Sequence, residues 1–328
     1  MEQIRVRKLS KSYTTFEQGH GLKDSLKGFF KRKTKIINAL NEVSFSINKG
    51  ELVGLIGPNG AGKSTTIKIL CGILFPTSGE AEIKVAGKAF VPWKSRVTFV
   101  KNIGVVFGQK SQLWFDLPPI DTFYLNKSIY DIPDSDFERR MKYFSDLLDV
   151  KEVIKRPTRQ LSLGERMKCE LMAALLHGPS LVFLDEPTIG LDIIVKEKIR
   201  DFISEINKKE GITFILTTHD LQDIDRLCKR VIILDKGSIA YDGPLETLKK
   251  NYIKEKNIRV VIEKMPKKKF AIKGAKIHRQ EGNDVWFRVP VSKVRDVTRT
   301  IVNNFELIDI NITEPSIEQV IAHIYRKK

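Results

Sequence analysis

The sequence predicts an α/β protein built on a largely parallel sheet, followed by a small α+β domain. Short apolar runs of strand length alternate with helical patterns over the first 240 residues, which is typical of strand–helix–strand units. A glycine-rich loop with a lysine and a serine follows one of these runs and opens a helical pattern. After residue 244 the chain changes to alternating apolar and polar side chains. Together these observations predict two domains with different architectures.

Four short apolar runs in the first part are expected to be buried strands. They are residues 52–56, 181–184, 213–216 and 231–234, and a helix is expected over residues 66–74. In the second part, alternation predicts strands, and helical spacing of apolar residues predicts helices. The expected strands are 258–263, 284–289 and 307–312, and the expected helices are 291–305 and 315–325. We place the domain boundary near residue 245, with domains 1–244 and 245–328.

An unusual basic segment of about residues 14–36 interrupts the first domain. Its apolar side chains recur at helical spacing between many lysines, at Leu22, Leu26, Phe29 and Phe30. This pattern predicts a short basic amphipathic helix. Such a helix either packs on its own domain or docks on a membrane surface or a membrane partner.

The charge of the chain lies mainly at its two ends. The 328 residues include 57 Lys and Arg against 40 Asp and Glu, a net charge of +17. Residues 1–50 carry 11 basic and 4 acidic side chains (+7), residues 51–244 carry 27 and 26 (+1), and residues 245–328 carry 19 and 10 (+9). Basic ends suit either the phosphate backbone of a nucleic acid or the negative cytosolic leaflet of a membrane.

Composition excludes several classes of protein. At 41% hydrophobic residues the chain is not a disordered polyelectrolyte. No run of 18 apolar residues is present to span a membrane, and the first residues lack an apolar signal region, so secretion is not expected. The three cysteines are scattered without metal-ligand spacing, which favours free thiols in a reducing compartment.

The glycine-rich loop matches the phosphate-binding pattern of nucleotide hydrolases. Its nine residues are Gly57, Pro58, Asn59, Gly60, Ala61, Gly62, Lys63, Ser64 and Thr65. Glycines allow backbone N–H groups to turn toward phosphate oxygens, and the start of the following helix adds a favourable dipole. Lys63 is expected to neutralise the β- and γ-phosphates, and the Ser64 hydroxyl to bind Mg²⁺.

Two adjacent carboxylates follow the apolar run 181–184. They are Asp185 and Glu186, which the run delivers to the carboxyl edge of a parallel sheet, where ligands bind. We expect Asp185 to hold Mg²⁺ through water and Glu186 to act as the base that activates water for attack on the γ-phosphate. Alone, such a pair is more often a helix cap; a phosphate loop upstream favours an ATP-hydrolysing site.

Five further elements extend the pattern. The segment 161–166, Leu-Ser-Leu-Gly-Glu-Arg, lies between the loop and the carboxylates, and the others are Gln109, the segment Gly190-Leu191-Asp192, His219 and Tyr13. Each of three of these residues, taken singly, has a simpler explanation. Gln109 could be a surface glutamine, His219 a histidine whose hydrogen bonds are made within the fold, and Tyr13 a core tyrosine. In this order, the elements of residues 1–244 resemble those of the ATP-binding cassette (ABC) ATPases.

The resemblance implies a fold and roles for these residues. The fold is a P-loop NTPase of ABC type, with a RecA-like core and a helical subdomain over about residues 110–175 that carries the signature. Tyr13 would stack on adenine, Gln109 would bind Mg²⁺ with Ser64 and Asp185, and His219 would contact the γ-phosphate. The resemblance also assigns ATP binding to Ser162, Leu163, Gly164, Glu165 and Asp192. Of these, Ser162 and Gly164 would face the γ-phosphate of the ATP on the opposite subunit.

The resemblance extends to one subgroup of the family. The segment 104–118 and the signature segment are similar to those of bacterial ABC-2-type exporter ATPases, and residues 313–320 resemble the ending of drug-exporter-like members. Leu163 and Glu165 depart from the commoner glycine and glutamine of the signature, and Ile189 precedes Gly190 where a small polar residue is frequent. These departures concern the interface between subunits.

The resemblance also implies partners. The expected protein is the ATP-binding and hydrolysing subunit of an ABC-2-type transporter, with ATP and Mg²⁺ as cofactors. It would pair with a second ATPase subunit, a homodimer rather than a heterodimer, and serve one or two ABC-2-type permease subunits. Its place would be peripheral, on the cytoplasmic face of the plasma or inner membrane, without nucleic acid.

Two other functions stay open. One is an ABC-type ATPase that acts on nucleic acid or ribosomes, which the basic ends suggest. The other is a regulatory role for the domain 245–328. The transported substrate is not encoded in this chain.

Overall fold

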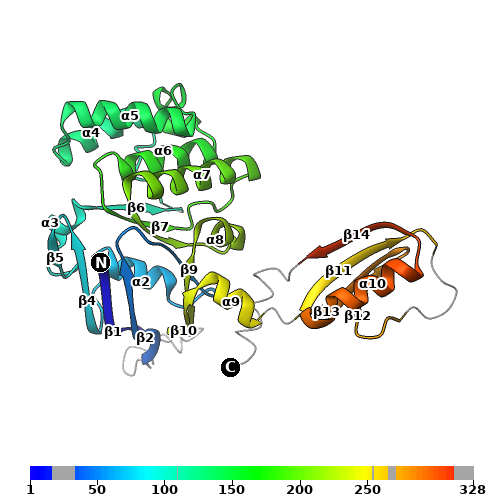
Figure 1. Cartoon of the computed structure of the whole chain (residues 1–328). Helices are drawn as coiled ribbons and strands as arrows, with labels where there is room; N and C mark the ends of the chain where they lie inside the picture. Colours follow the sequence, from blue (N-terminus) through cyan, green and yellow to red (C-terminus); the bar gives the residue numbers. More distant parts are fainter. Residues whose placement is uncertain (17–33, 109, 253–254, 265–270, 314–328) are drawn as a thin grey trace, which may run out of the picture. The chain divides into compact units, whose positions relative to one another are not determined.

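The computed structural model describes residues 1–16, 34–108, 110–252, 255–264 and 271–313 (Figure 1). The chain divides into two compact units, Met1–Gly243 and Pro244–Lys328.

A six-stranded sheet lies at the centre of the first unit. Its strands, in spatial order, are β10 (Ser238–Pro244), β9 (Arg230–Asp235), β3 (Leu52–Ile56), β8 (Thr213–Thr217), β7 (Leu181–Asp185) and β6 (Ile103–Phe107). The pairings β9–β3, β3–β8, β8–β7 and β7–β6 are parallel. The predicted, largely parallel sheet is therefore confirmed, and its strands include all four apolar runs.

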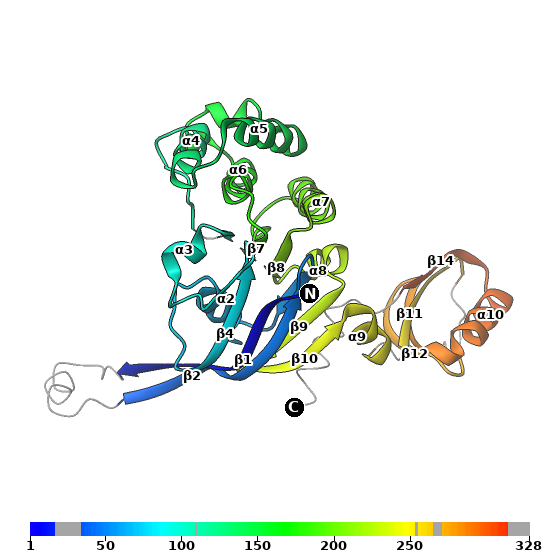
Figure 2. The same ribbon diagram turned by 60° about the vertical axis from the view of Figure 1, so that its left-hand side comes forward.

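A second, antiparallel sheet packs in the same unit. Its order is β2 (Thr34–Asn48), β1 (Glu2–Phe16), β4 (Ser78–Val85) and β5 (Lys88–Phe90). The pair β1–β2 is a long hairpin whose arm extends away from the rest of the unit (Figure 2). Residues 14–16 and 34–36, at the edges of the basic segment, continue these strands, whereas the amphipathic helix expected at Leu22–Phe30 lies outside the described residues.

Helix α2 (Lys63–Leu70) lies between the two sheets, in contact with β2 and β7 (Figure 2). Its Ile67, Ile69 and Leu70 are fully buried in a cluster with side chains from β1, β2, β3 and β4. Each such side chain contributes about 2 kcal/mol of transfer free energy. The helix begins three residues earlier than the expected Thr66 and ends at Leu70 rather than Leu74. The loop before it is therefore anchored on a rigid element.

The remaining helices of this unit form further layers (Figure 1). They are α3 (Arg96–Val100), α4 (Pro119–Ile129), α5 (Asp134–Leu148), α6 (Leu163–Leu175), α7 (Ile193–Glu210) and α8 (Leu221–Leu227), with short 3₁₀ turns at Val153–Lys155 and Thr158–Gln160. Helices α4 and α5 pack on α6 and α7, on the side away from the sheets (Figure 1). Helix α6 packs against α4, α5 and β6. The helices α4, α5 and α6, which form a helical layer, all come between β6 and β7 in the sequence. The signature segment opens α6.

The second unit holds its own core. Its antiparallel sheet has the order β12 (Lys276–Glu281), β13 (Asp284–Pro290), β11 (Glu255–Ile262) and β14 (Leu307–Thr313). Helix α10 (Val294–Asn304) follows a 3₁₀ turn at Val291–Lys293, and Val297 and Ile301 of α10 pack with the buried side chains of β11 and β13. Helix α9 (Leu245–Tyr252) precedes the sheet. The helix expected at 315–325 lies outside the described residues.

Two expectations from composition can be compared with the described part of the chain. Cys71, Cys169 and Cys228 are free and buried, and burial raises the pKa of each thiol. Among the described residues, no helix has the length and apolar character needed to cross a bilayer.

Candidate active site

The phosphate-loop sequence forms a tight connection between β3 and α2. The Ala61 N–H donates to the Pro58 carbonyl over 3.1 Å, and Gly62 adopts a φ of 105° at the start of α2. A side chain at Gly62 would come within 2.6 Å of the Ala39 carbonyl in β2. Only glycine therefore fits this position, because it combines the left-handed conformation with close approach of a second backbone.

The Lys63 ammonium lies over the loop that it terminates. Its Nζ donates to the carbonyls of Gly57 at 2.7 Å and Pro58 at 3.1 Å, and the residue is only 6% exposed. Burial lowers the pKa of Lys63, an effect opposed by the carboxylates of Glu186 and Asp185. The Lys63 ammonium is thus partly removed from water, and bound anionic phosphate groups would offset the free-energy cost of burying its charge.

Asp185 lies at the carboxyl end of β7, directly across from the phosphate loop. Its Oδ1 accepts a hydrogen bond from the Thr217 hydroxyl at 2.5 Å and one from the Ser64 hydroxyl at 3.3 Å. The sequence separates Ser64 and Asp185 by 121 positions, and the fold brings them together. Hydroxyl and carboxylate oxygens are the ligands that Mg²⁺ prefers, so this pair fits that ion.

Glu186 and His219 meet beside this pair. The Glu186 Oε2 and His219 Nε2 atoms are 2.6 Å apart, with 16% of the glutamate side chain and 52% of the histidine side chain exposed. Glu186 has a φ of 58°, an unfavourable value for a residue with a side chain. Its N–H donates to the Thr217 carbonyl at 2.9 Å. The backbone strain at Glu186 is therefore stabilised by the neighbouring strand β8.

Gln109 lies outside the described residues, but the residues on both sides of it are fixed. The Gly108 N–H donates to the Asp185 carbonyl at 2.8 Å, and a side chain at Gly108 would come within 2.2 Å of the Glu186 carbonyl. On the other side, the carboxylate of Glu170 in α6 accepts hydrogen bonds from the Ser111 hydroxyl and the Gln112 N–H. The segment that carries Gln109 therefore begins at the acidic pair and ends on α6.

Tyr13 lies in β1, opposite Ile37 of β2. The Ala39 carbonyl, two residues further along β2, lies close to Gly62 at the start of α2. Tyr13 therefore lies on the part of the hairpin that approaches the phosphate loop. The Lys11 ammonium lies 5.2 Å from the centre of the Tyr13 ring. The tyrosine is half-buried, with a ring that is not part of the buried core.

The signature residues form the capped start of α6. The Ser162 hydroxyl accepts from the Glu165 N–H at 3.2 Å, and the Glu165 carboxylate accepts from the Ser162 N–H at 2.9 Å. This reciprocal pair satisfies two backbone donors at the helix end. Burial opposes ionisation of Glu165, but the hydrogen bonds from Ser162 and the Arg156 guanidinium hold its pKa below the usual value. Glutamate at this position thus has a defined structural role.

The signature also packs against the segment after Glu186. A side chain at Gly164 would come within 2.9 Å of Val195 in α7, and one at Gly190 within 3.2 Å of Leu163. The Asp192 carboxylate caps α7 by accepting from the Val195 N–H at 2.9 Å. Ser162, Leu163 and Asp192 are exposed, and within the described part of the chain no hydrogen bond or ion pair joins them to the phosphate loop of the same chain.

Comparisons with known proteins show the family to which this chain belongs. Residues 40–189 match the family model described as "ABC transporter". The ABC transporter ATP-binding protein NatA of Bacillus subtilis is 32% identical over 219 residues, which are 67% of this chain and 87% of that protein. The chain belongs to the ABC transporter ATP-binding proteins. The ABC-type P-loop NTPase fold predicted from the sequence is thereby confirmed, and the protein is an ATPase.

Solved structures of ABC ATPases share the fold. A structure described as the ATP binding subunit of an ABC transporter superposes with a TM-score of 0.62 at 25% identity, over 76% of this chain and 93% of that one. A bacterial ABC transporter cassette solved as a dimer superposes with a TM-score of 0.59 at 25% identity, over 74% and 98%. Other relatives are named for probable multidrug transport and for methionine import.

Within this ABC cassette, the structure reveals a buried polar cluster that the sequence reading missed. Asp223 of α8 is fully buried and pairs with Arg200 of α7, which is 3% exposed. The same carboxylate accepts hydrogen bonds from Thr188 and Thr218. A signal was present, since Thr188 follows Glu186 by two residues and Thr218 precedes His219. Glu170, which anchors residues 111–112, gave no signal, because a charged residue within a helix is usually exposed.

Proposed function

We propose that this protein is the ATP-hydrolysing subunit of an ABC-2-type exporter and drives separate permease subunits through ATP-dependent closure of a dimer. The observation that carries the catalytic part is the contact of Glu186 with His219, 2.6 Å apart and next to Lys63, Ser64 and Asp185. A base, a lysine that can bind phosphate and a Mg²⁺-binding pair of residues lie together at the carboxyl edge of one sheet. This combination suits in-line attack of water on a γ-phosphate.

Each residue has a separate task in this proposal. Lys63 and the N–H groups of residues 57–65 bind the phosphates, and Tyr13 stacks on the adenine. Ser64, Asp185 and Gln109 hold Mg²⁺, which when bound neutralises phosphate charge. Glu186 accepts a proton from the attacking water, and His219, hydrogen-bonded to Glu186, holds the γ-phosphate and the glutamate in line.

The exposed signature supports a dimer of two such subunits. Ser162 and Leu163 lie at the surface, and two large apolar side chains next to Asp192, Ile193 and Ile194, are 78% and 82% exposed. A chain with one phosphate loop and one exposed signature can complete two ATP sites only when two copies pair head to tail. We propose a homodimer in which Ser162, Leu163, Gly164, Glu165 and Asp192 face the ATP of the partner copy.

An apolar surface near residues 110–130 supports a docking site for the permease. Trp114 and Phe115 are 57% and 65% exposed, and Tyr124, Leu125 and Ile129 of α4 are also exposed. Surfaces of this kind mark sites of protein contact. The occupant we propose is a cytoplasmic segment of a permease subunit.

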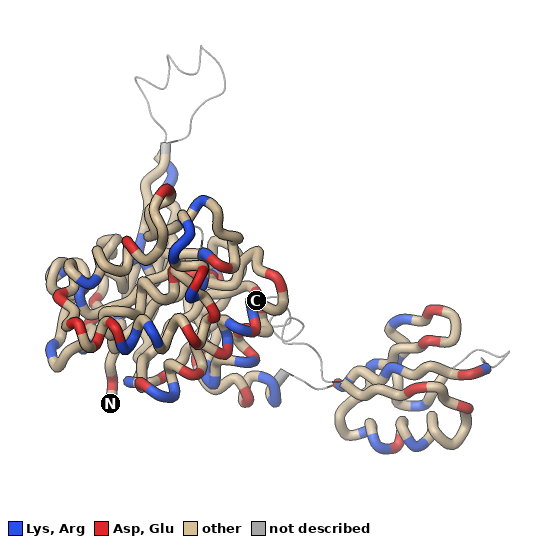
Figure 3. The backbone as a smooth tube through the Cα atoms, turned by 90° about the horizontal axis from the view of Figure 1, so that it is seen from above, with Lys and Arg blue, Asp and Glu red and all other residues tan. Residues whose placement is uncertain are grey.

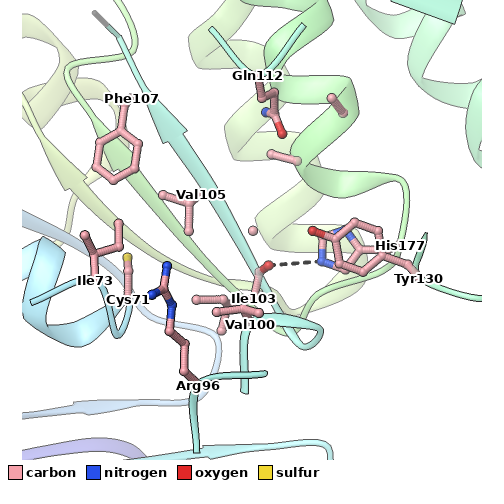
Figure 4. Close-up of a pocket in the computed structure, with 13 residues that line it drawn as sticks. Cys71, Ile73, Arg96, Val100, Ile103, Val105, Phe107, Gln112, Tyr130 and His177 are labelled. Carbon is pink, nitrogen blue, oxygen red and sulfur yellow. Dashed lines mark hydrogen bonds between the residues drawn. The ribbon is translucent and has the colours of Figure 1, made fainter. Parts of the chain in front are cut away.

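Two residues next to this segment in the sequence line a cavity of about 170 Å³ (Figure 4). Gln112 lies two residues before Trp114, and Tyr130 follows Ile129; both line the cavity. On its other side are Arg96 and Ile73, from the α2–α3 side of the unit. A permease side chain seated here would contact both the helical layer and the turn that follows the phosphate-loop helix.

Charge supports a peripheral position at the cytoplasmic face of the plasma or inner membrane. Acidic and basic side chains are interspersed over the first unit, in line with the net charge of +1 for residues 51–244 (Figure 3). The excess positive charge lies in residues 1–50 and 245–328. Each basic side chain near an anionic leaflet contributes about 1 kcal/mol of attraction.

The similarity of residues 104–118 to ABC-2 exporters supports the direction of transport.

The catalytic assignment is tested with Glu186→Gln. This change removes the base but keeps the size of the side chain, so kcat for ATP hydrolysis should fall by at least about a hundredfold. ATP binding and ATP-dependent dimerisation should persist, as measured by equilibrium binding and by size-exclusion chromatography with ATP. The control is Glu152→Gln, which changes an 84% exposed carboxylate. Normal turnover by Glu186→Gln would refute the role of Glu186.

The choice of partner is tested by affinity purification from detergent-solubilised membranes. The proposal predicts stoichiometric recovery of multispanning membrane proteins. Recovery of RNA or ribosomes without membrane proteins would support the alternative, an ABC ATPase that acts on nucleic acid.

A further inference from the structure

A buried ion pair joins the two helices that follow the catalytic strands. Arg200 of α7 donates from Nε to Asp223 Oδ1 of α8 over 2.7 Å. Arg200 is 3% exposed and Asp223 is fully buried. The other guanidinium nitrogens donate to Glu197 at 2.9 Å and Asp220 at 3.3 Å. Figures 1 and 2 both show α7 and α8 side by side.

The second oxygen of Asp223 binds two threonines. Oδ2 accepts from the Thr188 hydroxyl at 2.5 Å and from the Thr218 hydroxyl at 2.8 Å. Both threonines are buried, with 2% and 3% exposure. Asp223 therefore accepts three hydrogen bonds, two from hydroxyls and one from a guanidinium, and no water is needed to satisfy it. A buried carboxylate satisfied in this way fixes the positions of its partners.

These partners lie immediately beside the reacting groups. Thr188 is two residues after Glu186, and Thr218 directly precedes His219. The Thr218 hydroxyl also accepts from the Asp220 N–H at 2.9 Å, which fixes the turn on the far side of His219. One carboxylate oxygen thus connects the segment after β7 with the segment after β8.

Glu186 needs such support because its backbone is strained. A φ of 58° persists in a residue with a side chain only when the surroundings impose it. The hydrogen bond from Glu186 N–H to the Thr217 carbonyl fixes one side of this residue, and Thr188 fixes the other. His219, by contrast, is half-exposed, and its ring contacts the Glu186 carboxylate while the Thr218 hydroxyl fixes the backbone on either side of it.

We propose that Asp223 is a positioning residue for ATP hydrolysis, with Arg200 as its counter-charge, and that it holds the segments bearing Glu186 and His219 at reacting distance. Asp223 touches no nucleotide and acts through Thr188 and Thr218. The inference rests on the proposed roles of Glu186 and His219. If Asp223 acts in this way, its substitution should lower kcat without a matching loss of ATP affinity, because the phosphate loop lies outside the cluster.

The first test is Asp223→Asn, compared with Asp201→Asn, which alters an exposed aspartate of α7 next to Arg200. The amide keeps the size of the side chain but replaces one acceptor oxygen with a donor. A displacement near 1 Å at a reacting group costs about a hundredfold in rate, so a fall in kcat of about 10- to 100-fold is expected. KM for ATP and the affinity for a non-hydrolysable ATP analogue should match those of Asp201→Asn.

The second test keeps Asp223 and changes Thr188. Thr188→Val keeps the shape of the side chain and removes the hydroxyl, whereas Thr188→Ser retains the hydroxyl. The valine variant should lose kcat, and the serine variant should recover it. This pair decides the question if Asp223→Asn does not fold, because each variant leaves the ion pair intact.

The outcomes separate the two proposals. If Glu186→Gln is inactive while folded Asp223→Asn and Thr188→Val turn over like their controls, the positioning role is wrong and the catalytic assignment stands. If Glu186→Gln hydrolyses ATP normally, the catalytic assignment itself is wrong. Equal losses in the valine and serine variants would also contradict the inference, since both would then report packing alone.

Discussion

Gly108 offers a direct probe of how closely the Gln109 segment must approach Asp185 and the proposed base Glu186. In Gly108→Ala, the new Cβ would lie 2.2 Å from the Glu186 carbonyl oxygen, 3.0 Å from its carbon and 3.2 Å from the Asp185 carbonyl oxygen. Ordinary contact begins at 3.4 Å, so the two backbones must separate by about 1.2 Å. A displacement of that size at Glu186 predicts a loss of about a hundredfold in kcat. Overpacking adds about 1–3 kcal/mol of destabilisation.

The assay is steady-state ATPase activity together with thermal unfolding. The matched control is Gly87→Ala, in the turn between β4 and β5, where φ is 73° and no atom lies within 4 Å of the added Cβ. This control should lose about 1 kcal/mol of stability through backbone strain but keep its kcat. A Gly108→Ala protein with the kcat of the wild type would refute the reasoning, because the close approach would then be unnecessary for catalysis.

Two further predictions concern other parts of the protein. Burial lowers the pKa of His177 from 6.5 to about 4. Between these two pH values the unfolded chain binds more protons at this residue than the folded chain does, so acid favours unfolding. The free energy of unfolding should therefore be highest above pH 6.5 and fall by about 2 kcal/mol between pH 7 and pH 5. His177→Gln, whose amide can still donate to the Ile103 carbonyl, should flatten this dependence in urea unfolding, and an unchanged slope would exclude His177 as its source. Replacing residues 17–33 by a two-residue Asn-Gly turn should join the paired residues Phe16 and Thr34 without disturbing ATP binding. The same replacement should weaken co-purification with the permease, and undiminished co-purification would contradict a docking role for this segment.

Four buried strands of the first unit were predictable because each contains a short run of mainly apolar residues. Strands β3 and β8 are buried along their length and β7 up to Asp185, and such runs are recognisable without knowledge of their neighbours. The start of α2 was harder, because the backbone of Gly62 rather than periodicity sets it. Strand β12 was not predicted, since all six of its residues are exposed and no burial pattern distinguishes it from a loop.

At the site, the sequence predicted the residues that we propose to act directly on ATP, but not the residues that hold them in place. Lys63, Ser64, Asp185 and Glu186 lie in two short motifs whose spacing is a signal by itself. Asp223 satisfies Arg200 and two threonines from three different segments, and only the folded chain shows that they meet. Positioning residues of this kind depend on tertiary contact, which a single sequence does not reveal.

The central claim, that two copies of this chain complete each other's ATP sites, is tested most directly by mixing two inactive variants. Lys63→Ala removes the phosphate-loop charge, and Ser162→Arg blocks the exposed signature. Each should be inactive alone, whereas an equal mixture should recover about a quarter of the wild-type ATPase rate, because half of the dimers contain one intact composite site out of two. Full inactivity of the mixture, with mixed dimers demonstrated by cross-linking, would contradict the account.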